Sequence, residues 1–242
     1  LRMGEARNQY IYYKHYSHFW ADKTADFARA ANDVYAERKN SGRRVQYIAN
    51  YYRSGLEMHA RAIEILMIAN SAGLLDENAQ AQLVVFLQHE NRYGESIGLL
   101  ESLVKRRPDN ITYRTQLMDA YFHTQRPEQL ATLLKQIDEY FHADGRWTEG
   151  NIYEIGKACL GCRLNEQAVG YLNETISLHL RDYGPHGLND AGLSYRYDHL
   201  AEAESNLGHT KEAVDAASAA IVCWGPTMDQ RGHAIRKLNQ IL

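Results

Sequence analysis

The sequence LVVFL at residues 83–87 is the key to the fold, because its apolar pattern returns at a fixed offset as LMDAY at residues 117–121. The same offset of 34 carries Ser96 to Leu130 and Leu100 to Leu134. Each copy places apolar residues at i, i+1 and i+4 and, after a turn, at i, i+4 and i+7, the stripe of an amphipathic helix. A fixed period of this length that carries two helices predicts a helical-repeat solenoid.

The period continues on both sides of this stretch. The step from Ala62 to Ser96 is again 34, and the turn expected at Ser54 and Gly55 is one residue longer than in the following copies. Toward the C-terminus, the step from Leu130 to Ala168 is 38 and the step from Ala168 to Ala213 is 45. We expect the additional residues to form a longer linker at 142–145 and a longer second helix near 180–191.

Two turns resemble those of a known family. Pro108-Asp109-Asn110 resembles the turn between tetratricopeptide repeats, and LGHTKEAV at residues 207–214 is similar to the turn within one repeat. The step of 45, with its Gly184-Pro185 turn, resembles the lengthened repeats of kinesin light-chain-like tetratricopeptide arrays. The resemblance implies an all-α, right-handed superhelix whose first helices line a concave groove that binds proteins or peptides.

We expect three regions. Residues 1–43 form an irregular N-terminal helix pair, with a break near 18–23 and with Phe27, Ala31, Val34 and Tyr35 on one face of the second helix. Residues 44–224 form a solenoid of about five repeats. Residues 225–242 form a capping helix, in which Met228, Ile235, Leu238 and Ile241 line the apolar side.

The composition excludes several classes of protein. A chain of 242 residues that is 45% hydrophobic and 24% charged can fill a core, and its net charge of −3 offers no basic footprint for nucleic acid or an anionic membrane. No apolar run is long enough to span a bilayer, and the start resembles no signal peptide. We expect a soluble fragment or processed form of a longer protein, and its compartment cannot be assigned.

Candidates for chemistry are few, and we expect no catalytic, metal or cofactor site. The pair Cys159 and Cys162 forms a CxxC, but Cys159 falls at a helix-packing position and no second CxxC exists to complete a zinc site. His15 and His18 could share a helix face, yet no third ligand stands nearby. His89-Glu90 begins a zincin-like motif that Tyr93 interrupts.

The positions of the first helices that are not needed for packing predict a peptide-binding groove. It is lined by Arg44, Tyr47, Tyr51, Gln88, His89, Asp119, Phe122, His123, Tyr153, Lys157, Tyr195, Asp198 and Glu202. Half of these side chains could instead pack against neighbouring repeats. A clamp for chaperone tails needs clustered cations, whereas this surface mixes cations with carboxylates. A basic or mixed-polarity peptide with aromatic contacts fits better.

The predicted function is therefore a non-enzymatic scaffold or adaptor that binds a protein or peptide. We expect its strongest contacts where Tyr51, Phe122, His123, Tyr153 and Tyr195 converge, because buried aromatic side chains dominate binding energy. Two alternatives stay open. One is an enzyme or enzyme subunit with a site in the aromatic and histidine-rich segment 10–20. The other is a regulatory module that senses a signalling peptide.

Overall fold

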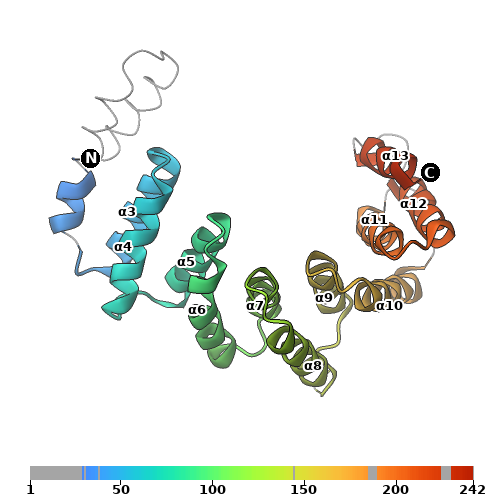
Figure 1. Cartoon of the computed structure of the whole chain (residues 1–242), viewed down its shortest axis with the longest axis horizontal. Helices are drawn as coiled ribbons and strands as arrows, with labels where there is room; N and C mark the ends of the chain where they lie inside the picture. Colours follow the sequence, from blue (N-terminus) through green and yellow to red (C-terminus); the bar gives the residue numbers. More distant parts are fainter. Residues whose placement is uncertain are drawn as a thin grey trace, which may run out of the picture. The chain divides into compact units, whose positions relative to one another are not determined.

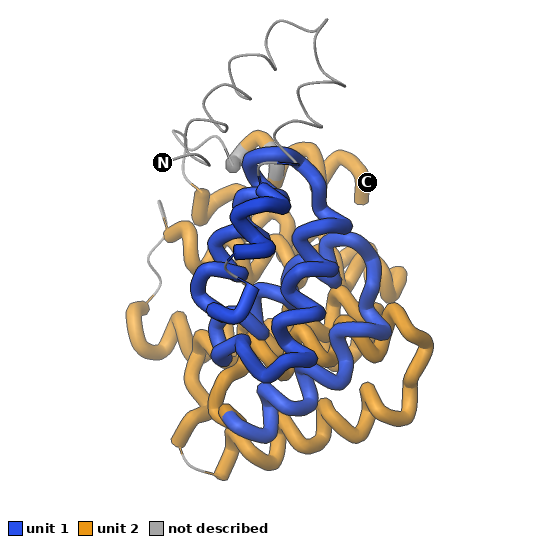
Figure 2. Tube along the Cα trace, turned by 90° about the vertical axis from the view of Figure 1, so that its left-hand side faces the viewer, with its two compact units in different colours: residues 1–106 blue, residues 107–242 orange. Residues whose placement is uncertain are grey.

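A computed structural model describes residues 29, 31–37, 39–143, 145–184, 190–224 and 230–241. It divides into two compact units, Leu1–Arg106 and Arg107–Leu242, which Figure 2 colours separately. All regular structure in the described residues is helical, and successive helices pair through short turns (Figure 1). The prediction of an all-α fold of helix-turn-helix repeats is confirmed. The division at residues 43 and 224 stays a prediction.

In its described part, unit 1 contains two helix pairs, which follow the helical residues 31–37. Its elements are α3 (Gly42–Asn50), the π-helix η1 (Tyr51–Gly55), α4 (His59–Ser71), α5 (Glu77–His89) and α6 (Tyr93–Arg106). The core holds Ile48, Ala62, Leu66 and Leu83, each at most 1% exposed, as their spacing predicts. Of the expected N-terminal face, Ala31 is buried, Val34 and Tyr35 are half-buried, and Phe27 lies outside the described residues.

Helix α3 does not end in the turn expected at Ser54 and Gly55. It continues as a π-helix, in which the Leu56 amide donates to the Tyr51 carbonyl oxygen at 3.1 Å, five residues back. A π-turn accommodates one inserted residue without breaking a helix. The extra residue of this repeat therefore lies inside the helix, and the turn prediction is wrong.

The described residues of unit 2 form three helix pairs and a final helix. They are α7 (Ile111–His123), α8 (Pro127–Ala143), α9 (Glu149–Gly161), α10 (Asn165–Tyr183), α11 (Ala191–Asn206), α12 (Thr210–Trp224) and α13 (Gln230–Ile241). Asn110, Thr148 and Asp190 cap the first helices by accepting backbone N–H groups three residues on. With 19 residues, α10 is longer than α6 with 14, as the lengthened step predicts.

The turn inside each repeat recurs in atomic detail. Asn91, Gln125, Arg163 and Gly208 take positive φ angles of 57°, 57°, 58° and 79° at equivalent positions of four repeats. After each of them, the next amide donates to a carbonyl oxygen five residues back, at 2.8–3.0 Å. This is the bond of a Schellman cap, which is usually built on glycine. Three repeats form it without glycine, so helix packing outweighs the local strain.

The final helix α13 differs from the expectation in its register. Ala234 is fully buried, Leu238 and Ile241 are half-buried, and Ile235 is 42% exposed. Met228 lies outside the described residues. The apolar contact of α13 with α12 therefore runs through Ala234, which packs near Ala220 and Trp224. The assignment of Ile235 to the packed side is wrong, because Ala234 holds the buried position and Ile235 follows it on the exposed side.

Candidate functional site

The first helices of unit 2 carry an aromatic cluster built around Tyr153. This half-buried side chain of α9 has its hydroxyl 3.1 Å from Nδ1 of His199 on α11. That same nitrogen lies 2.7 Å from the carbonyl oxygen of Tyr195, so it carries a proton and donates. The Tyr153 and His199 rings meet edge to face with centroids 5.7 Å apart. Tyr153 thus joins two successive first helices.

Two cations lie over the Tyr153 ring. The guanidinium carbon of Arg196 is 4.7 Å and Nζ of Lys157 is 4.9 Å from the ring centroid. Lys157 also pairs with Glu154 at 2.8 Å. Burial raises the pKa of Tyr153 to about 12, so the phenol stays neutral and remains a hydrogen-bonding group at physiological pH.

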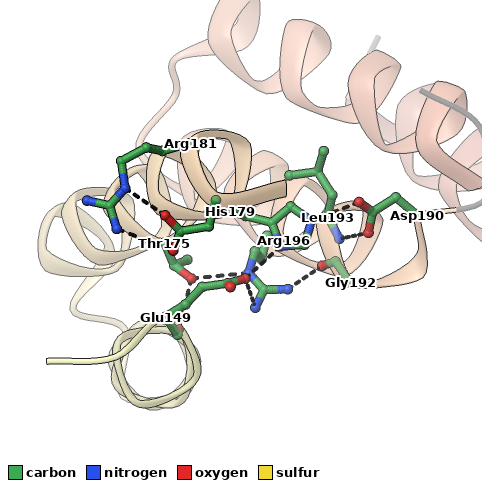
Figure 3. A network of polar contacts seen from close by, with 9 residues as sticks. Glu149, Thr175, His179, Arg181, Asp190, Gly192, Leu193 and Arg196 are labelled. Carbon is green, nitrogen blue, oxygen red and sulfur yellow. Dashed lines mark hydrogen bonds and ion pairs between the residues drawn. The ribbon is translucent and has the colours of Figure 1, made fainter. Parts of the chain in front are cut away.

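A polar network whose ionisable side chains are 11–18% exposed lies behind this cluster, at the joint between α9, α10 and α11 (Figure 3). His179 on α10 stands between two carboxylates, with Nδ1 2.7 Å from Glu149 and Nε2 2.8 Å from Asp190. Burial lowers the pKa of His179, but the hydrogen bonds to Asp190 and Glu149 outweigh it and raise the pKa above its ordinary value. A protonated imidazole can donate to both carboxylates at once.

Arg196 connects this network to the aromatic cluster. It donates to Glu149 at 2.5 Å, to the hydroxyl of Thr175 at 3.1 Å and to the carbonyl oxygen of Gly192 at 2.6 Å (Figure 3). The same guanidinium covers the Tyr153 ring. The network therefore fixes Tyr153 in one orientation. Its members fall at unrelated spacings in the sequence, so repeat analysis did not find it.

Tyr195 extends the cluster on α11. Its ring meets Trp224 of α12 edge to face at 4.6 Å, while 43% of the residue stays exposed. Trp224 is 2% exposed and forms a rigid base beneath it. An aromatic side chain that is held on one edge and open on the other suits a contact surface, because little conformational entropy remains to be lost on binding.

Three of the predicted groove residues, Asp119, Phe122 and His123, come from α7. Asp119 and His123 form a pair at 3.3 Å, and the rings of Phe122 and His123 meet at 5.3 Å. Asp119 and Phe122 are half-buried and His123 is exposed. Burial raises the pKa of Asp119, and the nearby His123 partly offsets this effect. Because α7 packs against α9, these side chains belong to the same unit as Tyr153.

Asp198 is not an open groove residue. It is 7% exposed, and Lys237 of α13 covers it, with Nζ 3.5 Å from its Oδ2. Glu202, one turn further along α11, is exposed but accepts from the same ammonium group at 3.1 Å. The sequence assignment placed both on a free surface because helical phase alone does not show that α13 returns to this face.

Tyr51 is also misassigned. It is 7% exposed and belongs to the core of unit 1. The first helices of unit 1 are offset by 35 rather than 34, so Tyr51 corresponds to Phe86 and then to Ala120, which are both buried. The surface position is one residue earlier, at Asn50. Applying the offset of 35 to the first helix of this repeat would have assigned Tyr51 to the core.

The other predicted positions of unit 1 do reach the surface. Arg44 and His89 are exposed, Tyr47 is 63% exposed and Gln88 is half-buried. Beside Tyr47 lies a small pocket of about 180 Å³, which is lined by Tyr47, Asn50, Tyr51, Ser54 and Gly55. The π-helix thus forms the wall of a surface depression.

An amide ladder that the sequence analysis missed joins α3 to α5. Gln46 donates to the side-chain oxygen of Gln82 at 2.9 Å, and Gln82 donates to that of Asn50 at 2.6 Å. All three residues are half-buried. The neutral amides satisfy one another across the repeat boundary, so no charge has to be desolvated there.

Of the five residues that were predicted to converge, four lie on the first helices of unit 2. Tyr153 contacts His199, which donates to the backbone carbonyl oxygen of Tyr195 in unit 2, and Phe122 and His123 lie on the adjacent α7. Tyr51 belongs to the other unit and is buried, so it is removed from the set.

The two cysteines of the CxxC are buried, at 0% and 3% exposure for Cys159 and Cys162. Burial raises the pKa of both thiols, to about 12 for Cys162, which disfavours the reactive thiolate. Within the described residues, no cluster of three His, Cys, Asp or Glu side chains could hold a metal ion. His15, His18 and the rest of segment 10–20 lie outside the described residues.

Comparison with known proteins supports the fold alone. No protein-family model matches the chain, and no curated protein matches it by sequence. Among solved structures, it is similar to the TPR-like repeats of a Podosopora anserina protein described as a "putative kinesin light chain", with a TM-score of 0.55 and 18% identity over 74% of this chain and 92% of that one. A point variant of the same repeats gives a TM-score of 0.57 and 16% identity, over 76% of this chain and 94% of that one.

The likeness shows that the chain has the TPR-like repeat fold. As to membranes, none of the helices in the described part of the chain combines the length and the apolar character needed to cross one.

Proposed function

We propose that this chain is a non-catalytic module that binds a protein or peptide segment along the exposed faces of its first helices. The observation that carries the proposal is the cluster of Tyr153, Tyr195 and His199, in which aromatic rings from two successive repeats are fixed side by side and stay partly open to solvent. Aromatic side chains in fixed positions supply most of the binding energy of protein interfaces.

The network behind the cluster supports this interpretation. Arg196, held by Glu149 and Thr175, keeps the Tyr153 ring in place before any partner arrives. A preorganised surface loses less conformational entropy on association, so more of the contact energy appears as affinity. In this proposal, the network positions the Tyr153 ring as well as stabilising the joint between the three helices.

The charges on the same faces indicate a partner of mixed polarity. Asp119, Glu154 and Glu202 alternate with Lys157 on the first helices of unit 2. Such a pattern favours a segment that carries at least one basic residue beside an apolar or aromatic one, and it disfavours a strongly acidic segment.

The test is a selection of peptides from a displayed random library on the purified full chain, followed by fluorescence anisotropy with each synthetic peptide. We expect sequences with a basic residue next to an aromatic one, at micromolar Kd. Selection of no peptide, or of peptides that bind equally well to a chain with Tyr153→Ala and Tyr195→Ala, would contradict the proposal.

A further inference from the structure

The acidic pair on α11 occupies positions at which the preceding repeat presents its contact residues. At the offset of 45 between these two repeats, Asp198 corresponds to Tyr153 and Glu202 corresponds to Lys157. The two pairs therefore occupy equivalent positions on successive first helices. Asp198 and Glu202 thus continue the proposed binding surface, yet they are already in contact with another part of the chain.

The occupant is a lysine of the final helix. Nζ of Lys237 lies 3.1 Å from Glu202 Oε2, 3.1 Å from the carbonyl oxygen of Asp198 and 3.5 Å from Asp198 Oδ2. Its side chain is 17% exposed, and that of Asp198 is 10% exposed. Three oxygen acceptors around one ammonium group match its three N–H donors. The geometry is that of a site for a primary amine on a side chain.

Helix α13, which carries Lys237, buries little apolar surface in its described part. Ala234 is the fully buried side chain of α13 within its described part, Ile235 is 42% exposed, and Leu238 and Ile241 are only half-buried. Burial of a single methyl group contributes far less than burial of a leucine or phenylalanine. Elements with so little buried apolar surface are among the first to open in a folded protein.

We propose that Asp198 and Glu202 form a subsite for a lysine or arginine side chain of the partner, and that α13 occupies it in the free protein. The partner then displaces Lys237 by offering the same charge together with contacts to Tyr153 and Tyr195. This inference rests on the proposed function, since it names the basic residue that the binding face accepts. Under this inference, α13 competes with the partner for the Asp198 and Glu202 subsite.

The experiment uses the full chain and a fluorescein-labelled synthetic peptide of residues 230–241, with a second peptide in which Lys237 is replaced by alanine. Wild-type protein should bind the first peptide weakly, because its own α13 competes. The Lys237→Ala protein should bind it at least 10-fold more tightly, and should bind the alanine peptide at least 10-fold more weakly than the lysine peptide. Adding Asp198→Asn and Glu202→Gln to Lys237→Ala should abolish the gain.

Lys211→Ala is the matched control, because Lys211 forms an exposed pair with Asp215 on α12 at 3.0 Å and should leave peptide binding at the wild-type level. Hydrogen exchange should rise in 230–241 of the Lys237→Ala protein and stay unchanged in α9. Equal binding of both peptides, unchanged exchange in α13, or a dimer that exchanges α13 between copies would each overturn the inference. Library peptides that bind all variants alike would overturn it and leave the proposed function standing.

Discussion

The two units use the same repeat but join their first helices with different chemistry. In unit 1, α3 and α5 meet through the neutral amides of Gln46, Gln82 and Asn50. In unit 2, α9 and α11 meet through charged groups, because Arg196 of α11 pairs with Glu149 of α9, and His179 of α10 pairs with the same carboxylate. An amide ladder has the same strength at any salt concentration or pH, whereas a charged joint responds to both.

The exposed faces of the first helices also differ in charge between the two units. The segment 42–55, which forms α3 and η1, carries three arginines and no acidic residue. Asp119, Glu154 and Glu202 lie on the corresponding faces of unit 2. The repeat fold therefore determines which positions of the first helices are exposed, while the local sequence determines the charge at those positions.

The largest expected effect is in the charged joint. Arg196→Ala leaves the Glu149 carboxylate in a nearly buried site with only His179, and removing one member of a buried pair costs about 3 kcal/mol or more. Hydrogen exchange of α9 and α11 amides should report a loss of this size in the local opening free energy. A loss below about 1 kcal/mol would show that the joint is not held by charge.

The neutral joint should be less sensitive. Gln82→Ala removes two hydrogen bonds and leaves Gln46 and Asn50 half-buried, so we expect a loss of about 1–2 kcal/mol in the opening free energy of α3 and α5. The loss should be the same at low and at high salt concentration. A strong dependence on salt would contradict the contrast between the units.

The pH dependence of unit 2 should be smaller still, because a neutral His179 can still donate to one carboxylate. The pKa of His179 in the folded protein lies above its ordinary value of 6.5. Its contribution to stability is therefore complete below that ordinary value and is lost as the pH rises through the folded pKa. Burial lowers the pKa of His199, which acts in the opposite direction. The difference between wild type and His179→Gln cancels this second effect and should shrink with rising pH.

The smallest effect is expected at an exposed pair. Lys135 and Glu139 on α8 are 3.7 Å apart, with 78% and 67% of their side chains exposed. Lys135→Ala should change the thermal melt of the chain by less than its experimental scatter, because solvent screens such pairs. A clear shift in Tm would show that charge on the second helices contributes more than their exposure suggests.

The fold could be predicted from the sequence because the recurring offset determines which side chains are buried. Leu83, Leu117 and Ile155 occupy one repeat position, and all three are buried. The surface residues were predicted less accurately than the buried ones. A single inserted residue moved Tyr51 into the core, and the return of α13 covered Asp198. The extra residue changes the offset to 35, but the offset does not show where in the repeat the residue lies, and the return of α13 leaves no periodic signal.

The polar network could not be predicted for a different reason. Glu149, His179 and Asp190 come from the start of α9, the end of a lengthened α10 and the cap of α11. Their separations of 30 and 11 residues match no repeat offset. Only the packing of the three helices brings them within hydrogen-bonding distance. Sequence periodicity finds what every repeat shares, and this network belongs to one joint.

The most direct test of the binding face compares two tyrosines. Tyr153 is on a first helix, and Tyr183, which is 57% exposed, is on the second helix α10. With a peptide selected on the full chain, Tyr153→Ala should raise the Kd about 30-fold, the equivalent of about 2 kcal/mol, while Tyr183→Ala should change it less than about threefold. Thermal melts should confirm that both variants stay folded. If Tyr183→Ala weakens binding and Tyr153→Ala does not, the partner binds to the second helices and the proposed face is wrong.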